Sequence, residues 1–544
     1  MIDKKENTQK SAVNMFFSGV LILTIANVLV KCVGLILKIV LNKVVGPTGA
    51  GYYSSAYEIY AFLYVIATSG LPVALSIMVS KRRAQGKLKE AKRIYNVAML
   101  LFFIIGGAFA TLMIAFSKNI AKFISAPETA VCIIAIAPTI LFICLSSCLR
   151  GYFQGYQMMK PTGISQFIEA LGKAGIGFVF AWWAKAQGYS DHIVAAFTIL
   201  GVTFGVFLGM VFLYVKKIFF KEKSFYDSSA LINDTSCKKA GDIFKELLKI
   251  ALPITLSSCV LSLTIIIDTL MVQNRLLASG LASELVRIYY GDYTTLVISM
   301  TNLPTILIYP ITNALVPLIS GAIAKNNFES AKNIRSLTMR IINVLSIPCA
   351  LTLGVFSYNA LSLLFSESSA ERAAPWLSVS VISVIFLGII SATNAFLNTD
   401  GKQRYPIISM ICGAGVKIIS NYFLVAKLGI IGAPISTVLC YLTAATLNVF
   451  FTVKHIGYLP NIKKMFGMPL ICGVASISVG MIVNAITIEI LPSKIATVIT
   501  FFAIAVMYLF LIIRTKTVTE GELKIIPQGT KIVHYLKKLH FFKK

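Results

Sequence analysis

The sequence has 544 residues, of which 57% are hydrophobic and 13% are charged, and its mean hydropathy is +0.81. Soluble domains are about 45–50% apolar and about 25% charged, so this composition excludes an ordinary soluble enzyme, and it excludes a disordered chain, which needs low hydrophobicity. Lys and Arg outnumber Asp and Glu by 50 to 22, giving a net charge of +28. In a soluble protein this excess would point to nucleic acid, but the long apolar runs indicate a polytopic membrane protein.

About fourteen apolar stretches are long enough for transmembrane helices, which need about 20 mostly apolar residues each. In chain order they are 13–42, 52–80, 94–117, 129–149, 161–184, 192–215, 250–274, 293–322, 341–366, 373–399, 405–426, 428–453, 465–488 and 495–513. A lipid-exposed backbone must satisfy its hydrogen bonds internally, and these runs are too long for barrel strands of about ten residues. The sequence therefore predicts an all-α membrane protein.

The basic residues alternate between the two sides of these spans. If the N-terminus is cytoplasmic, the cytoplasmic segments hold 37 of the 50 Lys and Arg residues and the opposite loops hold nine. Those cytoplasmic segments are 1–12, 81–93, 150–160, 216–249, 325–340, 402–404, 454–464 and 514–544. This asymmetry predicts that both termini are cytoplasmic. The start of the chain resembles a signal peptide but lacks a small-residue cleavage site, so we expect an uncleaved first span.

Cysteine and histidine usage argues against a metal site or a disulfide framework. The ten Cys residues are scattered, mostly within spans, and form no C-x-x-C pair, and there are only four His residues. We therefore expect no metal and no other bound cofactor.

The two halves of the chain show a weak internal repeat. Ala91-Lys92-Arg93-Ile94 matches Ala331-Lys332-Asn333-Ile334, 240 residues later, and 155–175 parallels 401–420 in its basic turn, Pro and later Lys. Six spans separate equivalent points, so the sequence predicts two parallel six-helix bundles plus two C-terminal helices, an arrangement suited to alternating access. The predicted domains are 1–215 and 250–453 as bundles, 216–249 as a basic linker, 465–513 as two extra helices and 514–544 as a cytoplasmic tail.

The segment LRGYFQGYQMMKPTGISQFIEALGK (149–173) resembles flippases of the stage V sporulation protein B type, which share a superfamily with lipid II flippases and multidrug and toxin extruders. The family pattern is R-G-x-F/Y-Q-G, Pro-Thr and Gln-x-x-Glu-x-x-x-Arg/Lys, and it is matched by Arg150 to Gly155, Pro161-Thr162, Gln166, Glu169 and Lys173. Residues 417–441 and Asp268 to Val272 also resemble the superfamily. The resemblance implies a transporter that moves a lipid-linked oligosaccharide, such as a peptidoglycan precursor, outward across the bacterial cytoplasmic membrane.

Several ionisable residues fall deep inside the predicted spans. A Lys at the bilayer centre costs about 2.5–3.5 kcal/mol, so such a residue faces an aqueous cavity or a charged partner. The deep bases are Lys31, Lys38, Lys173 and Lys417, and the deep acids are Glu169 and Asp268, with Glu58 and Asp292 nearer the span ends. Four bases against two acids predict a cavity that attracts anions. All four bases are Lys, which lacks the bidentate fork that Arg offers a phosphate.

The first-span lysines and Lys417 have two readings each. Lys31 and Lys38 are seven residues apart, so they share one face of a helix. We expect Lys31 to face the cavity, whereas Lys38 either does so or snorkels to the membrane surface. Lys417 and Asn421 are spaced i, i+4, and because no acid lies nearby in sequence, we expect both to face the cavity.

The fifth-span residues and Asp268 also leave alternatives open. Glu169 and Lys173 are spaced i, i+4 and either neutralise each other as a structural pair or form a polar wall with Gln166, which shares their face. Asp268 is either a coupling-ion site or the partner of a Lys on another span.

The excess of basic residues inside the predicted spans indicates an anionic substrate. Lysines can bind the pyrophosphate of a polyprenyl-linked saccharide as point charges, whereas they would repel a cationic drug. Our leading hypothesis is a flippase for such a lipid, coupled to the membrane potential or a monovalent cation. The alternative is a cation-coupled small-molecule exporter. An enzyme such as a glycosyltransferase is disfavoured, because no sizeable soluble domain or catalytic cluster is present.

The ends of the chain suggest further contacts with lipid. By the resemblance, the helices at 465–488 and 495–513 would form a groove for the polyprenyl tail, although the small residues of 465–488 also suit plain helix packing. The C-terminal KIVHYLKKLHFFKK (531–544) has the pattern of a basic amphipathic helix on anionic inner-leaflet lipids and lacks features for reading nucleic acid. The sequence does not indicate an oligomeric state.

Overall fold

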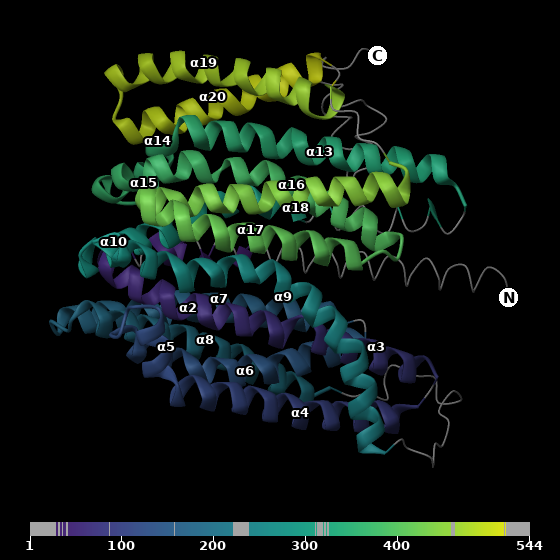
Figure 1. The fold of residues 1–544 in the computed structure, drawn as a ribbon. Helices are drawn as coiled ribbons and strands as arrows, with labels where there is room; N and C mark the ends of the chain where they lie inside the picture. Colours follow the sequence, from purple (N-terminus) through teal and green to yellow (C-terminus); the bar gives the residue numbers. More distant parts are fainter. Residues whose placement is uncertain are drawn as a thin grey trace. The chain divides into compact units, whose positions relative to one another are not determined.

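A computed structural model describes most of the chain as helices joined by short turns (Figure 1). The described residues are 42–85, 87–156, 158–220, 239–309, 326–458 and 463–515, with a few residues in 29–39 and 312–323 and residue 517. Lys31, most of the first predicted span and the tail 531–544 lie outside the described residues.

The chain divides into two compact units. Unit 1 comprises Met1–Leu277 and Ala282–Gly291, and unit 2 comprises Ala278–Leu281 and Asp292–Lys544. Each unit is described by itself below. The helix spanning residues 240–278 is grouped almost entirely with unit 1; the predicted domain boundaries, which were drawn from the sequence repeat, stay a prediction.

The described residues of unit 1 are helices joined by turns, and its core is built from apolar residues of nearly all these helices. Its helices are α2 (Gly46–Thr68), α3 (Gly70–Ala84), α4 (Leu88–Ala115), α5 (Ser117–Phe123), α6 (Thr129–Gly155), α7 (Met159–Ala186), α8 (Asp191–Ile218), α9 (Ala240–Ala278) and α10 (Ser283–Asp292). The predicted separation of 161–184 from 192–215 is confirmed, since α7 ends at Ala186 and α8 begins at Asp191.

The second predicted span, 52–80, lies within one stretch that is long and apolar enough to cross a membrane, Gly46–Arg83. Its helix is interrupted near Gly70-Leu71-Pro72, since α2 ends at Thr68 and α3 begins at Gly70. Pro72 lies in the first turn of α3, where its missing N–H costs no helical hydrogen bond, and it cannot extend α2. Gly70 also lies against α9, because a Cβ there would clash with the backbone of Ala251.

A stripe of glycines on α8 brings it against α7. Gly201, Gly205 and Gly209 recur every four residues, which places them on one face of the helix. A Cβ built at Gly205 would lie 2.5 Å from the backbone nitrogen of Lys173 and 2.7 Å from the carbonyl oxygen of Glu169. Small residues permit this close approach of membrane helices, and here it fixes the position of the α7 backbone.

Unit 2 is also all-helical within the described residues. Its elements are a π-helix at Tyr293–Val297, α11 (Ile298–Asn302), α13 (Phe328–Val355), α14 (Ser357–Leu364), α15 (Glu367–Ser380), α16 (Ile382–Thr399), α17 (Arg404–Leu428), a 3-10 turn at Gly429–Ile431, α18 (Gly432–Ile456), a π-helix at Lys463–Gly467, α19 (Met468–Ile490) and α20 (Ser493–Arg514). The split of 405–426 from 428–453 is confirmed by a break at Gly429, whose φ of +69° favours glycine.

The two C-terminal helices pack on α13. The Tyr508 hydroxyl of α20 donates a hydrogen bond to the carbonyl oxygen of Val344 at 2.8 Å. In α19, Gly473 faces Leu351, and Gly480 faces Ile504 of α20. The small residues of α19 therefore serve close helix packing, the simpler of the two readings of their sequence pattern.

The helices of the described residues confirm an all-α membrane fold. Ten helical stretches are long and apolar enough to cross a membrane by length and composition. The count of fourteen stays a prediction, because parts of 13–42 and 293–322 are not described. Some helices begin well before the predicted spans: α9 begins at Ala240 and α13 at Phe328, so much of the segment 325–340 is helical.

We predict that Gly205→Ala destabilises the protein, because the new methyl group must push α8 away from the backbone of Glu169 and Lys173. Overpacking of this kind costs about 1–3 kcal/mol. Gly175→Ala on α7 is the matched control, since nothing lies within 4 Å of a Cβ at that position. Thermal unfolding in detergent should show a lower Tm for Gly205→Ala and an unchanged or higher Tm for Gly175→Ala. Equal Tm values would contradict the tight α7–α8 contact.

Candidate functional site

The two halves of the 149–173 motif meet across a helical hairpin in unit 1. Helix α6 ends at Gly155, and α7 begins at Met159, so the last turns of α6 run antiparallel to the first turns of α7. Arg150 projects from α6, and Ser165, Glu169 and Lys173 recur every four residues on α7, which places them on one face. We call Arg150, Ser165, Glu169 and Lys173 the α6–α7 charge cluster.

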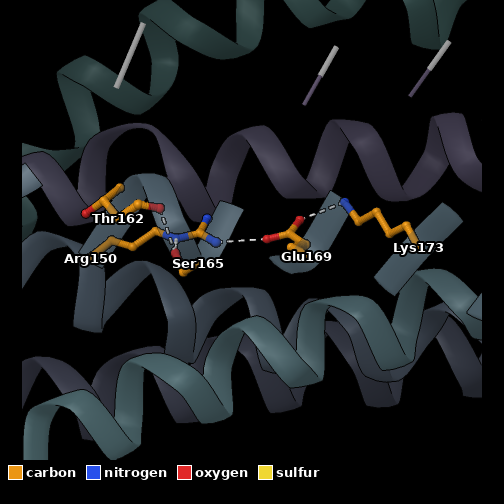
Figure 2. Close-up of polar contacts among 5 residues, drawn as sticks. All are labelled: Arg150, Thr162, Ser165, Glu169 and Lys173. Atoms are coloured by element: carbon orange, nitrogen blue, oxygen red, sulfur yellow. Dashed lines mark hydrogen bonds and ion pairs between the residues drawn. The ribbon is translucent and has the colours of Figure 1, made fainter. Parts of the chain in front are cut away.

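Figure 2 shows that the Glu169 carboxylate lies between the two bases of this cluster. Its Oε2 accepts a hydrogen bond from Arg150 Nη2 at 2.8 Å, and its Oε1 accepts one from Lys173 Nζ at 2.7 Å. Arg150 Nε also donates to Ser165 Oγ at 3.1 Å, and Ser165 Oγ donates in turn to the carbonyl oxygen of Thr162 at 2.8 Å. The guanidinium of Arg150 on α6 is therefore held by two side chains of α7.

The cluster is buried and carries a net positive charge. The side chains of Arg150 and Glu169 are each 6% exposed, and that of Lys173 is 17% exposed. Two bases and one acid leave one positive charge in excess. Removing charges from water is costly unless they are paired and hydrogen-bonded, which accounts for the three-membered arrangement. Lys173 is the most accessible of the three charged groups.

Polar oxygen atoms without hydrogen-bond partners lie on the helices around the cluster. They are Tyr60 Oη on α2 and Thr162 Oγ1 and Gln166 Oε1 on α7, and they are buried. Tyr60 lies within electrostatic range of both Glu169 and Arg150. Buried polar groups are nearly always hydrogen-bonded in native proteins, and these three atoms have no partner among the described residues.

A ladder of tyrosines on α2 borders the same region. The ring centroids of Tyr53 and Tyr57 are 5.6 Å apart and stacked, those of Tyr57 and Tyr60 are 5.7 Å apart, and those of Tyr60 and Tyr64 are 5.9 Å apart. Tyr57 is half-buried and lies within electrostatic range of Lys173. The ladder gives unit 1 a polar, aromatic wall beside the cluster.

A second group of charges in unit 1 contains Lys38, Glu58 and Asp268. Glu58 of α2 interacts electrostatically with both Lys38 and Asp268. Glu58 is 8% exposed and Asp268 of α9 is 4% exposed, so both acids are buried within unit 1, and their depth in the membrane stays a prediction. Lys38 therefore has an acidic neighbour inside unit 1. The role of Asp268 in ion coupling stays a prediction.

Unit 2 holds the remaining predicted pair. Lys417 and Asn421 lie one turn apart on α17 and are buried, with exposures of 1% and 0%. Near the ends of the helices of this unit, Arg372 Nη2 pairs with Asp292 Oδ2 at 2.8 Å, and Arg335 pairs with Asp400. Within the described residues no group of three or more His, Cys, Asp or Glu side chains could hold a metal ion.

The main residue that sequence reasoning missed is Arg150. We placed it in a cytoplasmic segment and concluded that all the deep bases are Lys; this is wrong, because Arg150 is buried within α6 and pairs with Glu169. Its burial depends on tertiary structure, since α6 and α7 bring Arg150 within 3.1 Å of Ser165 Oγ. Of the predicted residues, the structure brings Glu169 and Lys173 together, with Gln166 on the same helix, and Lys417 and Asn421 together in the other unit.

We predict that Arg150→Met is strongly destabilising, because breaking a buried ion pair from one side costs about 3–5 kcal/mol. Lys185→Met is the control, since its pair with Asp191 is 52% and 41% exposed, and exposed pairs are worth about 0–1 kcal/mol. Thermal unfolding and the yield of folded protein measure both. If Arg150→Met were as stable as Lys185→Met, the cluster would not be a structural unit.

Comparison with known proteins begins with family models. The model described as "Polysaccharide biosynthesis protein" matches residues 16–323, and the model described as "MatE" matches residues 253–423. Stage V sporulation protein B of Bacillus subtilis (strain 168) is 25% identical over 524 residues, covering 94% of this chain and 98% of that protein. Lipid II flippase MurJ of the same organism is 24% identical over 465 residues, covering 81% and 83%.

Solved structures confirm the fold. A lipid II flippase MurJ in an inward closed conformation superposes with a TM-score of 0.64 at 16% identity, covering 90% of this chain and 98% of that one. A multidrug resistance MATE family transporter of the MOP superfamily, in an inward-facing conformation, also gives 0.64 at 15% identity, covering 79% and 94%. The resemblance stated from the 149–173 motif is confirmed, as is the prediction of a multi-pass membrane transporter and not an enzyme. Since the first family model covers more than half of the sequence, the chain belongs to the polysaccharide biosynthesis protein family.

Proposed function

We propose that the protein is a flippase that moves an anionic polyprenyl-pyrophosphate-linked oligosaccharide outward across the bacterial cytoplasmic membrane by alternating access. The observation that carries the proposal is the α6–α7 charge cluster, a buried group with one excess positive charge. One of the two curated relatives supports the same class of substrate, since it is a lipid II flippase by name. The proposal names the chemical class of the substrate and not a particular sugar or carrier lipid.

The cluster has the donors that a pyrophosphate requires. Lys173 Nζ donates one hydrogen bond to Glu169, so two of the three N–H groups of the ammonium can donate to a ligand. Its side chain is 17% exposed, whereas Arg150 is nearly covered. Hydrogen bonds between charged groups contribute about 1.5–3 kcal/mol each, so a single accessible ammonium changes phosphate affinity measurably.

The neighbouring groups suit a sugar headgroup. Tyr57 is half-buried beside the cluster, and the unpartnered Gln166 Oε1 offers an acceptor for a hydroxyl. Lys417 of unit 2 is a further buried base, and we propose that it also contacts the anionic headgroup during transport. Its charge is independent of the cluster, so the two can be tested separately.

The membrane potential gives a driving force without a dedicated ion site. Moving one elementary charge across the membrane is worth about 2.3 kcal/mol per 100 mV. A bacterial membrane that is negative inside therefore favours the outward movement of an anionic headgroup. Coupling to a monovalent cation at Asp268 would add to this force but is not needed for its direction.

The alternative is a cation-coupled exporter of small molecules. It is favoured by the MatE model match at 253–423 and by the buried acids Glu58 and Asp268, which are suited to binding a cation. The excess positive charge at the α6–α7 cluster argues against cationic drugs as cargo, since like charges repel in a low-dielectric site. The two functions predict opposite results with anionic lipids and cationic dyes.

We predict that Lys173→Ala slows lipid flipping by about tenfold or more, because it removes one charge-assisted hydrogen bond to the pyrophosphate. Lys173→Arg should retain most activity, and Lys185→Ala, at an exposed pair, should match wild type. The measurement is transbilayer movement in proteoliposomes, using lipid II and a polyprenyl-pyrophosphate disaccharide unrelated to peptidoglycan as separate substrates. Lys417→Ala tests the second base in the same assay.

Wild-type protein that moves neither lipid, or that moves one equally well after Lys173→Ala and Lys417→Ala, would contradict the flippase proposal. Export of a cationic dye driven by a sodium or proton gradient would favour the exporter instead. The two lipids also separate the finer alternatives, because movement of only one of them identifies the class of envelope polymer that the protein serves.

A further inference from the structure

The Glu169 carboxylate occupies the position that an anionic ligand of the cluster would take. Its two oxygen atoms accept hydrogen bonds from Arg150 at 2.8 Å and from Lys173 at 2.7 Å. These are the geometry and charge that a substrate phosphate offers to the same donors. The cluster therefore already contains an anion of its own, supplied by the same helix as one of its bases.

The two bases are held very differently. Arg150 is fixed at both ends of its fork, by Glu169 and by Ser165, which itself bonds the backbone of Thr162. Lys173 makes one contact within the cluster, at i, i+4 on the same helix, and its side chain is nearly three times more exposed than that of Glu169. Lys173 can leave Glu169 by rotating its own side-chain bonds, without moving the backbone, whereas Arg150 cannot leave.

We infer that Glu169 is an internal counter-ion that competes with the substrate phosphate for Lys173 and expels it at the end of transport. The inference rests on the proposed function. In the empty site Glu169 holds Lys173. An arriving phosphate takes Lys173, while Arg150 keeps Glu169 in place and neutralised. When the phosphate leaves, Glu169 takes Lys173 back, and the cost of exposing a free ammonium is avoided.

The arrangement limits how tightly the site can hold its ligand. A transport site must bind well enough to load and weakly enough to release. A phosphate that must displace the Glu169 carboxylate binds with a free energy equal only to the difference between the Lys173–phosphate and Lys173–Glu169 interactions. The oxygen atoms of Tyr60 Oη, Thr162 Oγ1 and Gln166 Oε1 are buried without a hydrogen-bond partner, and in this inference they are further acceptors or donors for the headgroup besides the charge pair.

The test is binding of undecaprenyl pyrophosphate to the full-length protein in nanodiscs, together with flipping in proteoliposomes. Glu169→Gln keeps the shape of the side chain and removes its charge. We expect it to bind the lipid about tenfold more tightly and to flip it more slowly. Lys173→Ala should bind about tenfold more weakly. Glu90→Gln is the matched control, since Glu90 is another buried acid of unit 1 and pairs with Arg82 at 3.1 Å; it should bind like wild type.

Glu169→Gln also removes a partner of Arg150, so folding is checked by thermal unfolding. If Glu169→Gln does not fold, binding is measured with Glu169→Asp instead. The shorter acid still neutralises Arg150 but lies farther from Lys173, so this variant should also bind the lipid more tightly than wild type. Unchanged or weaker binding of the lipid by the folded Glu169 variant would overturn the inference. The proposed flippase function would still stand if Lys173→Ala weakened binding. Wild-type protein that does not bind the lipid would overturn both.

Discussion

A carboxylate shared by two buried bases is the constraint around which unit 1 is organised. Charges removed from water require partners with accurate geometry, and Glu169 receives its partners from two helices. The accuracy depends on backbone contacts. Glycines on α8 allow it to approach the backbone of Glu169 and Lys173, and the short turn after Gly155 sets Arg150 opposite Ser165. The motif at 149–173 is thus a packing motif and a charge motif at the same time.

The sequence predicted one helix of this site and missed the other. Helical periodicity placed Gln166, Glu169 and Lys173 on one face, and a Glu169–Lys173 pair was one of the two alternatives that the i, i+4 spacing left open; the structure contains that pair at 2.7 Å. Arg150 was assigned to a loop because a hydropathy-based span ends at the first charged residue. A buried Arg paired with an acid 19 residues later is invisible to a local window, since its partner is supplied by tertiary structure.

The sequence likewise predicted the class of fold and the order of the helices but not all of the helix ends. Apolar length and the basic loops indicated a helical membrane protein, and α4 and α13, both 28 residues long, begin 240 residues apart as the repeat suggested. The errors occur where hydropathy is a poor guide to helix ends. Helix α13 begins well before its apolar segment, at a cap in which Asn327 accepts a hydrogen bond from the backbone N–H of Ser330.

The division of labour between Arg150 and Lys173 follows from their chemistry. An arginine is a rigid, always charged fork, which suits a residue that must hold Glu169 and Ser165 simultaneously, whereas a lysine is a flexible point charge that can exchange partners. A site made of lysines alone would leave several ammonium groups unneutralised when empty and would release a pyrophosphate slowly. In the mechanism that we propose, one acid between a fixed and a movable base avoids both problems, because it stabilises the empty site and weakens the binding of the ligand. A base that exchanges partners must be more accessible than a base that stays fixed, and Lys173 is more exposed than Arg150.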